Sequence, residues 1–382
     1  MHALPPVTVI LLNYRSAEDL PACLGALLAQ TFQNFDVLLV DQGMKDGSTQ
    51  HMLEVFGPAF GGRLQALFAG RNLGFAGGCN LAFPQAKGTW WALLNTDAVP
   101  APGWLEALVK VGESEERVTM CASRIHLLEH PARLENIGQG LYPDGLNVPI
   151  GRGALDGPAW DTPREVLCPS AAAGLYRADA VRSVGGLDSR FFAYGEDLDL
   201  GLSLRAKGGR CLYVPDARVS HHLSGTWGRR SLRKTFLVER NRLWVALHHF
   251  PLAALAALPA LTALRWGATL REGFSGKGPL AHLGSALRPM PKPGPPPPLG
   301  TRLGAATRLL LTAGAATSGV AAALLTAPAH LRTRRELREL GAQGSKQYPF
   351  LIDAFGASMG EAAKQWLGDP KSPPSETPSL SE

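Results

Sequence analysis

The sequence predicts an α/β fold, with a doubly wound, mostly parallel, Rossmann-like sheet followed by a helical, membrane-associating C-terminal region. Three observations support this prediction. Apolar runs alternate with helical stretches through the first hundred residues, polar residues collect where those runs end, and the chain turns basic and apolar after residue 228. Strand–helix alternation of this kind is typical of parallel sheets with helices on both faces.

The first hundred residues contain four apolar runs separated by three stretches of helical pattern. Buried strands are expected at residues 7–14, 36–43, 64–70 and 90–97, with helices at 17–30, 48–56 and 76–86. Ligands in such sheets bind beyond the carboxyl ends of the strands. We therefore expect a ligand at this edge, where the strand ends carry Asn13, Asp41, Arg71, Asn72, Asn95 and Asp97.

Residues 101–190 are less regular. Their pattern predicts a helix at 103–111, a strand near 118–125, an irregular loop region and a small-residue strand at 168–176. A further strand is expected at 211–214. Small side chains at 168–176 either let a substrate approach the backbone or pack the strand tightly. A helix is expected to open at Glu196 and Asp197, and His221 follows Asp197 by 24 residues.

The chain is divided into three parts by these patterns. Residues 1–228 are expected to form one domain, with a regular first half at 1–100 and a second half at 101–228. Residues 229–345 are expected to be basic, apolar and helical, with a Pro-rich linker at 289–298. The segment 346–382 is expected to end in a disordered polar tail.

Two uncharged windows, 243–264 and 309–331, reach the roughly 20 residues that span a bilayer. If both windows crossed the membrane, the basic loop between them would face outward, whereas Lys and Arg usually collect in cytoplasmic loops. Helices lying on the cytosolic membrane surface fit the charges better. We expect anionic lipid headgroups to attract six basic residues near the start of this region: Arg229, Arg230, Arg233, Lys234, Arg240 and Arg242.

Composition narrows the class of protein. The 382 residues are 45% hydrophobic and 18% charged, as in folded proteins, and the net charge is +6. A generally basic composition and a membrane partner explain this charge equally well. No recognition motif supports nucleic-acid binding. The five cysteines are scattered singly, which predicts reduced thiols. We expect a cytoplasmic protein, peripheral on the inner face of the plasma membrane.

Four motifs occur in a fixed order along the chain. They are VDQGMKDGST around Asp41, RNLGFAGGCN from Arg71, NTD from Asn95, and ED at Glu196, which is followed by His221. Together they resemble the inverting glycosyltransferases of family 2, in the GT-A fold group. The resemblance covers about residues 5–250 and is nearest to the bacterial rhamnosyltransferase-like branch.

The resemblance implies that residues 1–100 are the nucleotide-binding half and residues 101–228 the acceptor or catalytic half. Asp41 would bind the base; its alternative role is to cap the helix near Ser48. The glycine-rich loop would approach the phosphates, and the helix after it would present free N–H groups. The residues implied for the donor are Asn13, Asp41, Arg71, Asn72, Gly77, Gly78, Asn80 and Asn95. Gln42 and Gly43 depart from the family pattern.

The resemblance also implies a divalent metal ion, Mg²⁺ or Mn²⁺, held by Asp97 and His221. Asn95-Thr96-Asp97 occupies the place of the family's DxD motif, but its first residue is neutral. Oxygen ligands beside a diphosphate suit these hard cations. Asp97 can still coordinate the ion, and the same departure occurs in the branch that this chain resembles, so the metal is expected despite Asn95.

Asp197 is implied as the catalytic base, with Glu196 supporting the acceptor or the loop. The alternative is a charge pair that favours the helix N-terminus. Asp199 is expected to be structural. These residues predict a metal-dependent inverting glycosyltransferase that uses a nucleotide-diphospho-sugar, dTDP-rhamnose or a UDP-sugar, and a glycan or lipid-linked acceptor in envelope or exopolysaccharide synthesis.

Three rival functions remain to be weighed. A catalytically inactive nucleotide-binding scaffold at the membrane is the alternative that Asn95 and Gln42 support. A nucleotidyltransferase would need a glycine-rich basic loop after the first strand, where this chain has Asn13-Tyr14-Arg15-Ser16. A glycoside hydrolase needs two carboxylates on opposite sides of the sugar, about 5–10 Å apart, and neighbouring Glu196 and Asp197 do not suggest that.

Overall fold

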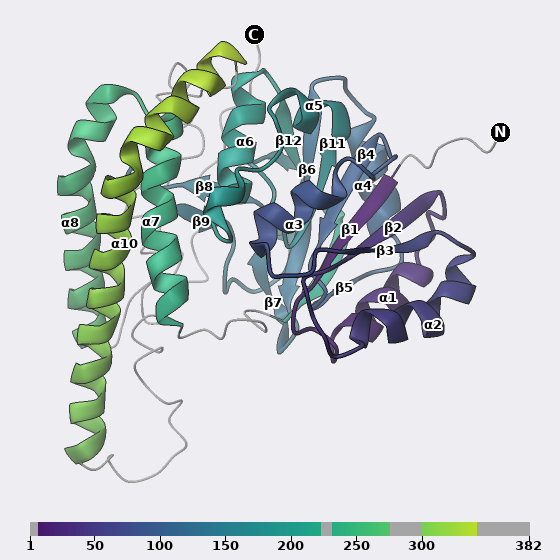
Figure 1. Ribbon diagram of the computed structural model, residues 1–382, viewed down its shortest axis with the longest axis horizontal. Helices are drawn as coiled ribbons and strands as arrows, with labels where there is room; N and C mark the ends of the chain where they lie inside the picture. Colours follow the sequence, from purple (N-terminus) through teal and green to yellow (C-terminus); the bar gives the residue numbers. More distant parts are fainter. Residues whose placement is uncertain (1–6, 223–230, 276–298, 342–382) are drawn as a thin grey trace.

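The computed structural model describes residues 7–222, 231–275 and 299–341, and Figure 1 shows a sheet flanked by helices with three long helices beside it. The first hundred residues alternate strand and helix, as predicted. Their elements are β1 (Val7–Asn13), α1 (Leu20–Leu28), β2 (Phe35–Asp41), α2 (Ser48–Phe60), β3 (Leu64–Phe68), α3 (Gly74–Ala82), β4 (Trp90–Leu94) and β5 (Ala98–Pro100).

The second part of the chain adds the remaining strands and all of the long helices. The strand predicted at 211–214 continues to His221, so this histidine ends a strand instead of following it. The elements are α4 (Trp104–Gly112), β6 (Val118–Leu127), β7 (His130–Asn136), β8 (Gln139–Leu141), β9 (Asn147–Pro149), η1 (Pro158–Trp160), β10 (Arg164–Glu165), β11 (Ala173–Arg177), α5 (Ala178–Ser183), η2 (Ser189–Phe191), α6 (Glu196–Ala206), β12 (Arg210–His221), α7 (Leu232–His249), α8 (Leu252–Ser275) and α10 (Leu299–Glu339).

The main sheet runs in the order β10-β12-β6-β11-β4-β1-β2-β3. Strands β4, β1, β2 and β3 are parallel, as the alternation predicts. Beyond β4 the sheet is mixed, because β11 lies antiparallel between β4 and β6. The doubly wound α/β fold is confirmed: the first hundred residues form a parallel block of four strands, and β6 and β12 form a further parallel pair.

Helices cover both faces of the sheet and enclose two cores. On β1, Val9 and Leu11 point toward the core shared with α1, α2 and α4, whereas Ile10 points toward the core shared with α3, α5 and α6. Alternate residues of a strand face opposite sides, so a run that is apolar throughout fills both cores. Each fully buried Leu, Ile or Val contributes about 1.5–3 kcal/mol.

The two apolar windows have different outcomes. The window at 243–264 is not one continuous helix, because α7 ends at His249, Phe250 is buried and α8 begins at Leu252. The window at 309–331 lies inside α10. Within the described residues, the segment Leu311–Glu339 is the one helix long and apolar enough to cross a membrane by length and composition, and 17% of its most apolar window is buried. The predicted linker at 289–298 and the segment 346–382 lie outside the described residues.

Helix α10 packs along α7 through residues spaced three, four or seven apart (Figure 1). This spacing places them on one helical face. Gly319 allows the closest approach, since a Cβ there would lie 2.5 Å from the carbonyl oxygen of Phe236. The buried residues of this face are Ala316, Gly319, Ala323, His330, Arg334 and Leu337.

A pair of glycine substitutions on α10 is expected to have opposite effects. Gly319→Ala should lower the free energy of unfolding by about 1–3 kcal/mol, because the new methyl group overlaps Phe236. Gly314→Ala should raise it by about 0.5–1 kcal/mol, because nothing lies within 4 Å of its Cβ and alanine favours the helix. Urea denaturation of both variants checks this, and equal effects would contradict the packing of α10 on α7.

Candidate active site

Two strand ends bring three of the expected residues together. Asn95 and Asp97 follow β4, and β12 pairs with β5 so that His221 stands opposite Ala98. His221 Nε2 consequently lies 3.1 Å from Asp97 Oδ1 and 3.2 Å from Asn95 Nδ2. The structure therefore joins residues separated by more than a hundred positions in sequence.

Glu135, at the end of β7, holds this histidine from the other side. Its Oε2 accepts a hydrogen bond from His221 Nδ1 at 2.7 Å, and its Oε1 accepts one from Arg152 at 3.2 Å. Burial alone would lower the pKa of His221, but the charges of Glu135 and Asp97 outweigh burial and raise the pKa to about 10. Sequence analysis missed Glu135, which is buried and lies 86 positions from His221.

Asp97 and His221 fit a divalent cation. Two ligand atoms at right angles, each about 2.1 Å from an octahedral ion, are about 3.0 Å apart. The 3.1 Å between Asp97 Oδ1 and His221 Nε2 matches that spacing. With Nδ1 donating to Glu135, the ring directs Nε2 at Asp97, which is the orientation that a metal-binding histidine requires.

Glu196 and Asp197 open α6 and are both buried. Asp197 Oδ1 accepts from the backbone of Leu198 at 2.9 Å, and Oδ2 accepts from the backbone of Ala171 at 3.3 Å and from Gln139 at 3.4 Å. Burial raises the pKa of Asp197, although these hydrogen bonds oppose the shift. Burial and the neighbouring Asp197 raise the pKa of Glu196 to about 8. Glu196 Oε2 has no hydrogen-bond partner among the described residues.

A short backbone segment connects the Asp97–His221 pair to the Glu196–Asp197 pair. Asn95 N donates to the carbonyl oxygen of Ala172 at 2.9 Å, and the preceding residue, Ala171, donates to Asp197. The loop before β11 thus separates the Asp97–His221 pair from the carboxylates. Residues 171–172 lie within the small-residue strand predicted at 168–176, but β11 itself starts only at Ala173.

The loop before α6 has an uncommon backbone. Phe192 and Tyr194 have φ values of 66° and 72°, in the left-handed region that non-glycine residues rarely adopt. Asn241 of α7 holds it, donating to the carbonyls of Phe191, Ala193 and Tyr194 at 3.0, 2.9 and 2.6 Å. Such outliers persist where the surroundings fix them and often lie at functional sites.

Asn13 and Asp41 stand opposite each other at the ends of β1 and β2. Asn13 Nδ2 donates to Ser48 Oγ at 3.0 Å and to Thr49 Oγ1 at 2.8 Å. Asp41 accepts from the backbone of Gly43 and from Thr49 Oγ1. Both side chains are thus engaged within the protein. Base binding by Asp41 stays a prediction. Asp41 does not act as the cap of α2, because its backbone partners are the loop residues Gly43 and Met44 and it reaches the helix only at the Thr49 hydroxyl.

The glycine-rich loop is packed against neighbouring segments. Gln42 accepts from Leu73 N at 2.9 Å and donates to the carbonyl of Gly74 at 2.8 Å, which gives a role to this departure from the family pattern. A Cβ on Gly78 would lie 2.5 Å from Gln42 Nε2. A Cβ on Gly77 would lie 2.9 Å from that of Leu73. Internal packing therefore requires both glycines, whatever they contribute to a ligand.

Three polar side chains of the loop have different surroundings. Asn72 Oδ1 accepts from the backbone of Gly74 at 2.8 Å, and Arg71 is exposed. Asn80 donates to Ser189 Oγ at 3.0 Å and accepts from Leu187 N at 3.0 Å. The amide of Asn80 thus fastens α3 to the segment before η2, and we assign it to the scaffold instead of the donor site.

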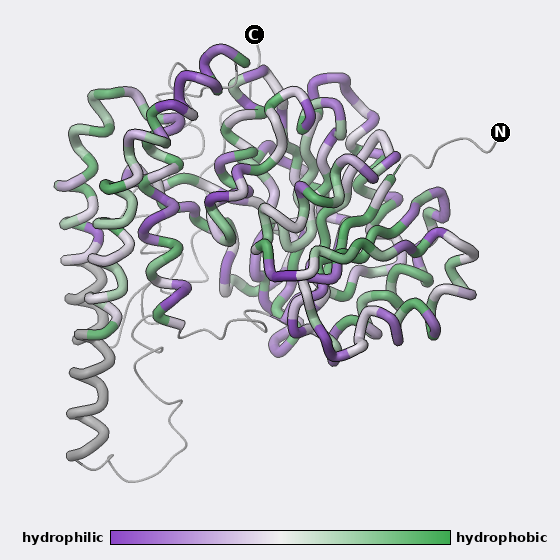
Figure 2. The backbone as a smooth tube through the Cα atoms, in the orientation of Figure 1, coloured by the Kyte–Doolittle hydropathy of each residue, from purple (hydrophilic) through white to green (hydrophobic). Residues whose placement is uncertain are grey.

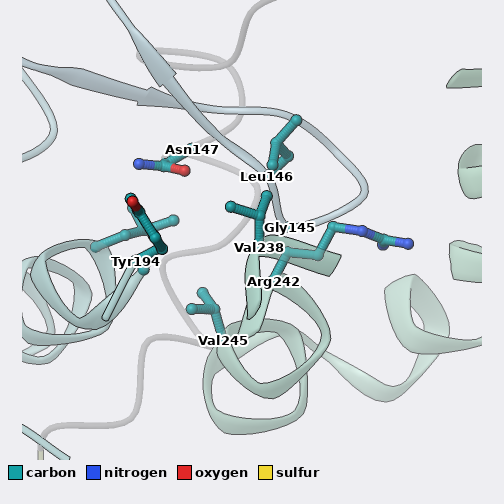
Figure 3. A pocket seen from close by; sticks show the side chains of 9 residues that line it. Gly145, Leu146, Asn147, Tyr194, Val238, Arg242 and Val245 are labelled. Carbon is teal, nitrogen blue, oxygen red and sulfur yellow. The ribbon is translucent and has the colours of Figure 1, made fainter. Parts of the chain in front are cut away.

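A small pocket lies beside the start of α6 (Figure 3). Tyr194 and Asn147 face each other across it, and the Arg242 guanidinium points away from Tyr194. The pocket is bounded by the β8–β9 turn, the start of α6 and one face of α7. Its lining is mainly apolar and comprises Gly145, Leu146, Asn147, Tyr194, Gly195, Leu198, Val238, Arg242 and Val245.

Two basic side chains expected at lipid headgroups point inward instead. Arg242 is 3% exposed and donates to Glu239 at 2.7 Å. Arg240 lies over the ring of Trp244 at 4.0 Å and donates to the carbonyl of Phe191 at 2.9 Å. The headgroup assignment is wrong for Arg242 and unsupported for Arg240, because a charge pattern does not reveal internal partners. Arg229 and Arg230 lie outside the described residues.

Comparison with known families agrees with this geometry. The family model described as "Glycosyl transferase family 2" matches residues 8–138, and "Glycosyl transferase family group 2" matches residues 160–275. The first match contains Asp41 and Asp97, and the second contains Asp197 and His221. Together they cover both halves of the site.

Individual relatives point the same way. An N-acetylglucosaminyl-diphospho-decaprenol L-rhamnosyltransferase of Mycobacterium tuberculosis is 28% identical over 58% of this chain and 77% of its own length. The O-antigen biosynthesis protein RfbC of Myxococcus xanthus is 30% identical over 58% of this chain and 18% of its own length. A structure of GalNAc-T7 with UDP, GalNAc and Mn²⁺ superposes with a TM-score of 0.52 at 16% identity, covering 65% of this chain and 49% of that one. This last likeness concerns the fold, which is GT-A.

Proposed function

Since the chain belongs to glycosyltransferase family 2, in its rhamnosyltransferase-like group, we propose that it is a metal-dependent, inverting enzyme using a nucleotide-diphospho-sugar donor. One observation carries the proposal. The Asp97–His221 pair and the Glu196–Asp197 pair lie on either side of residues 171–172, joined through hydrogen bonds of that segment. A cation and a base in such proximity suit transfer from a diphosphate donor to a hydroxyl.

Asp197 is the base in this mechanism. Inversion requires one carboxylate to take the proton of the acceptor hydroxyl as that oxygen attacks the anomeric carbon, at about 2.6–3.2 Å. Burial raises the pKa of Asp197 and so strengthens it as a proton acceptor. Its contacts with Ala171, Leu198 and Gln139 fix its orientation. A cation held by Asp97 and His221 supplies charge that stabilises the departing diphosphate.

The substrates follow from the relatives' chemistry. The mycobacterial relative is named for rhamnosyl transfer to a diphospho-decaprenol acceptor, and the Myxococcus relative for O-antigen synthesis. We propose dTDP-rhamnose or a UDP-sugar as donor, and a glycan or lipid-linked acceptor in envelope or exopolysaccharide synthesis. The pocket between Tyr194 and α7 is lined by Gly195 and Leu198, which flank Glu196 and Asp197 in sequence, and we propose that the acceptor approaches Asp197 from this side (Figure 3).

Calorimetric titration with UDP, dTDP and GDP, with and without Mn²⁺, tests the donor site. Metal-dependent binding of one nucleotide is expected, followed by transfer from the corresponding nucleotide-sugar. Binding without transfer would favour the alternative, an inactive nucleotide-binding scaffold, which the neutral Asn95 motivates. No binding to any of the three would contradict the proposal.

We place the enzyme at the inner face of the plasma membrane through the outer faces of α8 and α10. Figure 2 shows hydrophobic stretches on both helices, and α10 exposes 66% of Leu324 and 83% of Leu325. Exposed Arg332 and Arg335 follow them on α10 and suit anionic headgroups. Because the opposite face of α10 is packed on α7, a helix lying on the membrane fits better than one crossing it.

Replacing both leucines with glutamate should weaken vesicle binding by more than about a hundredfold. Each leucine buried in lipid contributes about 1.5–3 kcal/mol. Co-sedimentation with phosphatidylglycerol vesicles measures the effect. Val55→Glu is the matched control, because Val55 is 54% exposed on α2, away from this face. Undiminished binding by the double variant would rule out α10 as the contact.

A further inference from the structure

Four buried polar side chains connect the helix of Glu196 and Asp197 to the C-terminal helix. They have no part in the mechanism proposed above, and all are at most 6% exposed. We call them the Asp199 relay: Asp199 on α6, His248 and His249 at the end of α7, and His330 on α10.

The relay is a continuous chain of hydrogen bonds. Asp199 Oδ1 accepts from His248 Nδ1 at 2.7 Å and from His249 Nε2 at 3.0 Å. His248 Nε2 lies 2.9 Å from His330 Nδ1. Each of these two nitrogens donates or accepts according to the tautomer of its ring, so the two rings share one hydrogen bond. Burial opposes ionisation of Asp199, but the histidines outweigh it and hold the pKa of this carboxyl below its usual value.

Helix α10 fixes the far end of the relay. The ring of His330 stacks on Trp244 of α7 with centroids 4.1 Å apart. One turn further along α10, Arg334 donates to the carbonyl oxygens of Leu247 and Phe250 at 3.0 and 2.7 Å. It thereby holds the C-terminal end of α7, where His248 and His249 lie. The position of α10 is therefore transmitted to Asp199 through a buried polar contact.

We propose that Asp199 is a positioning residue that sets the rotation of α6 and hence the aim of Asp197, with His330 supplying the anchor from α10. The inference rests on the proposed function. Residues two apart on a helix point about 200° from each other, so the anchor and Asp197 lie on opposite sides of α6. A rotation of about 10° moves a group about 5 Å from the axis by roughly 1 Å. A displacement of that size can cost about a hundredfold in rate.

Two substitutions of His330 test the proposal. His330→Leu removes the hydrogen-bond partner of His248, whereas the side-chain amide of His330→Asn, which has both a donor and an acceptor, can take the place of Nδ1. For the leucine variant we expect kcat to fall about tenfold or more, with KM and nucleotide affinity nearly unchanged. The asparagine variant should recover most of kcat. Hydrogen exchange of residues 196–206 should rise in the leucine variant alone.

Thr326→Val is the matched control. Thr326 lies on the same helix and accepts a hydrogen bond from Trp244 Nε1 at 3.0 Å, outside the relay. The Thr326→Val variant should have a lower melting temperature than the wild type and an unchanged kcat. Wild-type kcat in His330→Leu, or an equal loss in Thr326→Val, would overturn the proposal. So would one zinc ion per purified chain that His249→Ala removes, because these side chains would then be metal ligands.

The failure of this proposal is distinguishable from that of the proposed function. If the wild-type protein transfers no sugar under any condition, the proposed function fails. The hydrogen-exchange comparison still decides whether His330 holds α6. If the wild type is active and the two His330 variants behave alike, only the relay is wrong.

Discussion

Replacing Asp197 with asparagine is expected to reduce sugar transfer by about 100- to 10,000-fold and to leave donor affinity nearly unchanged. The amide keeps the shape of the carboxyl group but does not accept a proton from the acceptor hydroxyl. Asp197 is held by Ala171, Leu198 and Gln139, none of which is an expected donor-binding residue, so the donor site should remain intact. Single-turnover transfer and calorimetric donor binding, measured on one preparation, check both parts.

Glu196→Gln is the matched control, because it removes a neighbouring buried charge from the same helical turn. Burial and the charge of Asp197 raise the pKa of Glu196, so both favour its neutral form, which the amide of glutamine resembles. We expect this variant to keep far more activity than Asp197→Asn. The reverse order would assign the base to Glu196, whose Oε2 has no hydrogen-bond partner among the described residues. Loss of donor binding in Asp197→Asn would count against its role as the base.

The sequence predicted the parallel half of the sheet well because the signal there is local. An apolar run bounded by polar residues identifies β1, β2 and β4 wherever they lie in the fold. No local pattern states the direction of a strand, and β11 runs antiparallel between β4 and β6. Nor does an apolar window show where a helix ends, and the turn at Phe250 and Pro251 divides the first window.

The site was predicted only in part, for a related reason. Motif order identified Asp97 and His221, which the structure brings within 3.1 Å. Glu135 carries no motif, and its role appears only when β7 and β12 are brought together. Conversely, Asn80 belongs to a motif, but its amide is engaged by Leu187 and Ser189. Residue type and spacing suggest chemistry, whereas the partner of each side chain is a property of the fold.

Glu135→Gln is expected to weaken Mn²⁺ binding by about 10- to 100-fold in the presence of nucleotide. Glu135 accepts the Nδ1 hydrogen of His221 at 2.7 Å and thereby directs Nε2 toward Asp97. The glutamine retains a hydrogen-bonding oxygen but loses the charge that increases the basicity of the histidine. Electron paramagnetic resonance of free Mn²⁺ measures this affinity without relying on catalysis.

Glu113→Gln controls for loss of a carboxylate elsewhere. Glu113 follows α4 and accepts a hydrogen bond from Trp90 Nε1, away from Asp97 and His221. The Glu113→Gln variant should bind Mn²⁺ with the affinity of the wild type. EDTA should stop transfer by the wild-type enzyme, and added Mn²⁺ or Mg²⁺ should restore it. Full activity in EDTA would remove Asp97 and His221 as metal ligands. Unchanged Mn²⁺ affinity in Glu135→Gln would leave the metal site in place but would contradict the orienting role of Glu135. A carboxylate that orients a ligand acts through that ligand, so a Glu135 without effect on Mn²⁺ binding would contribute to packing alone.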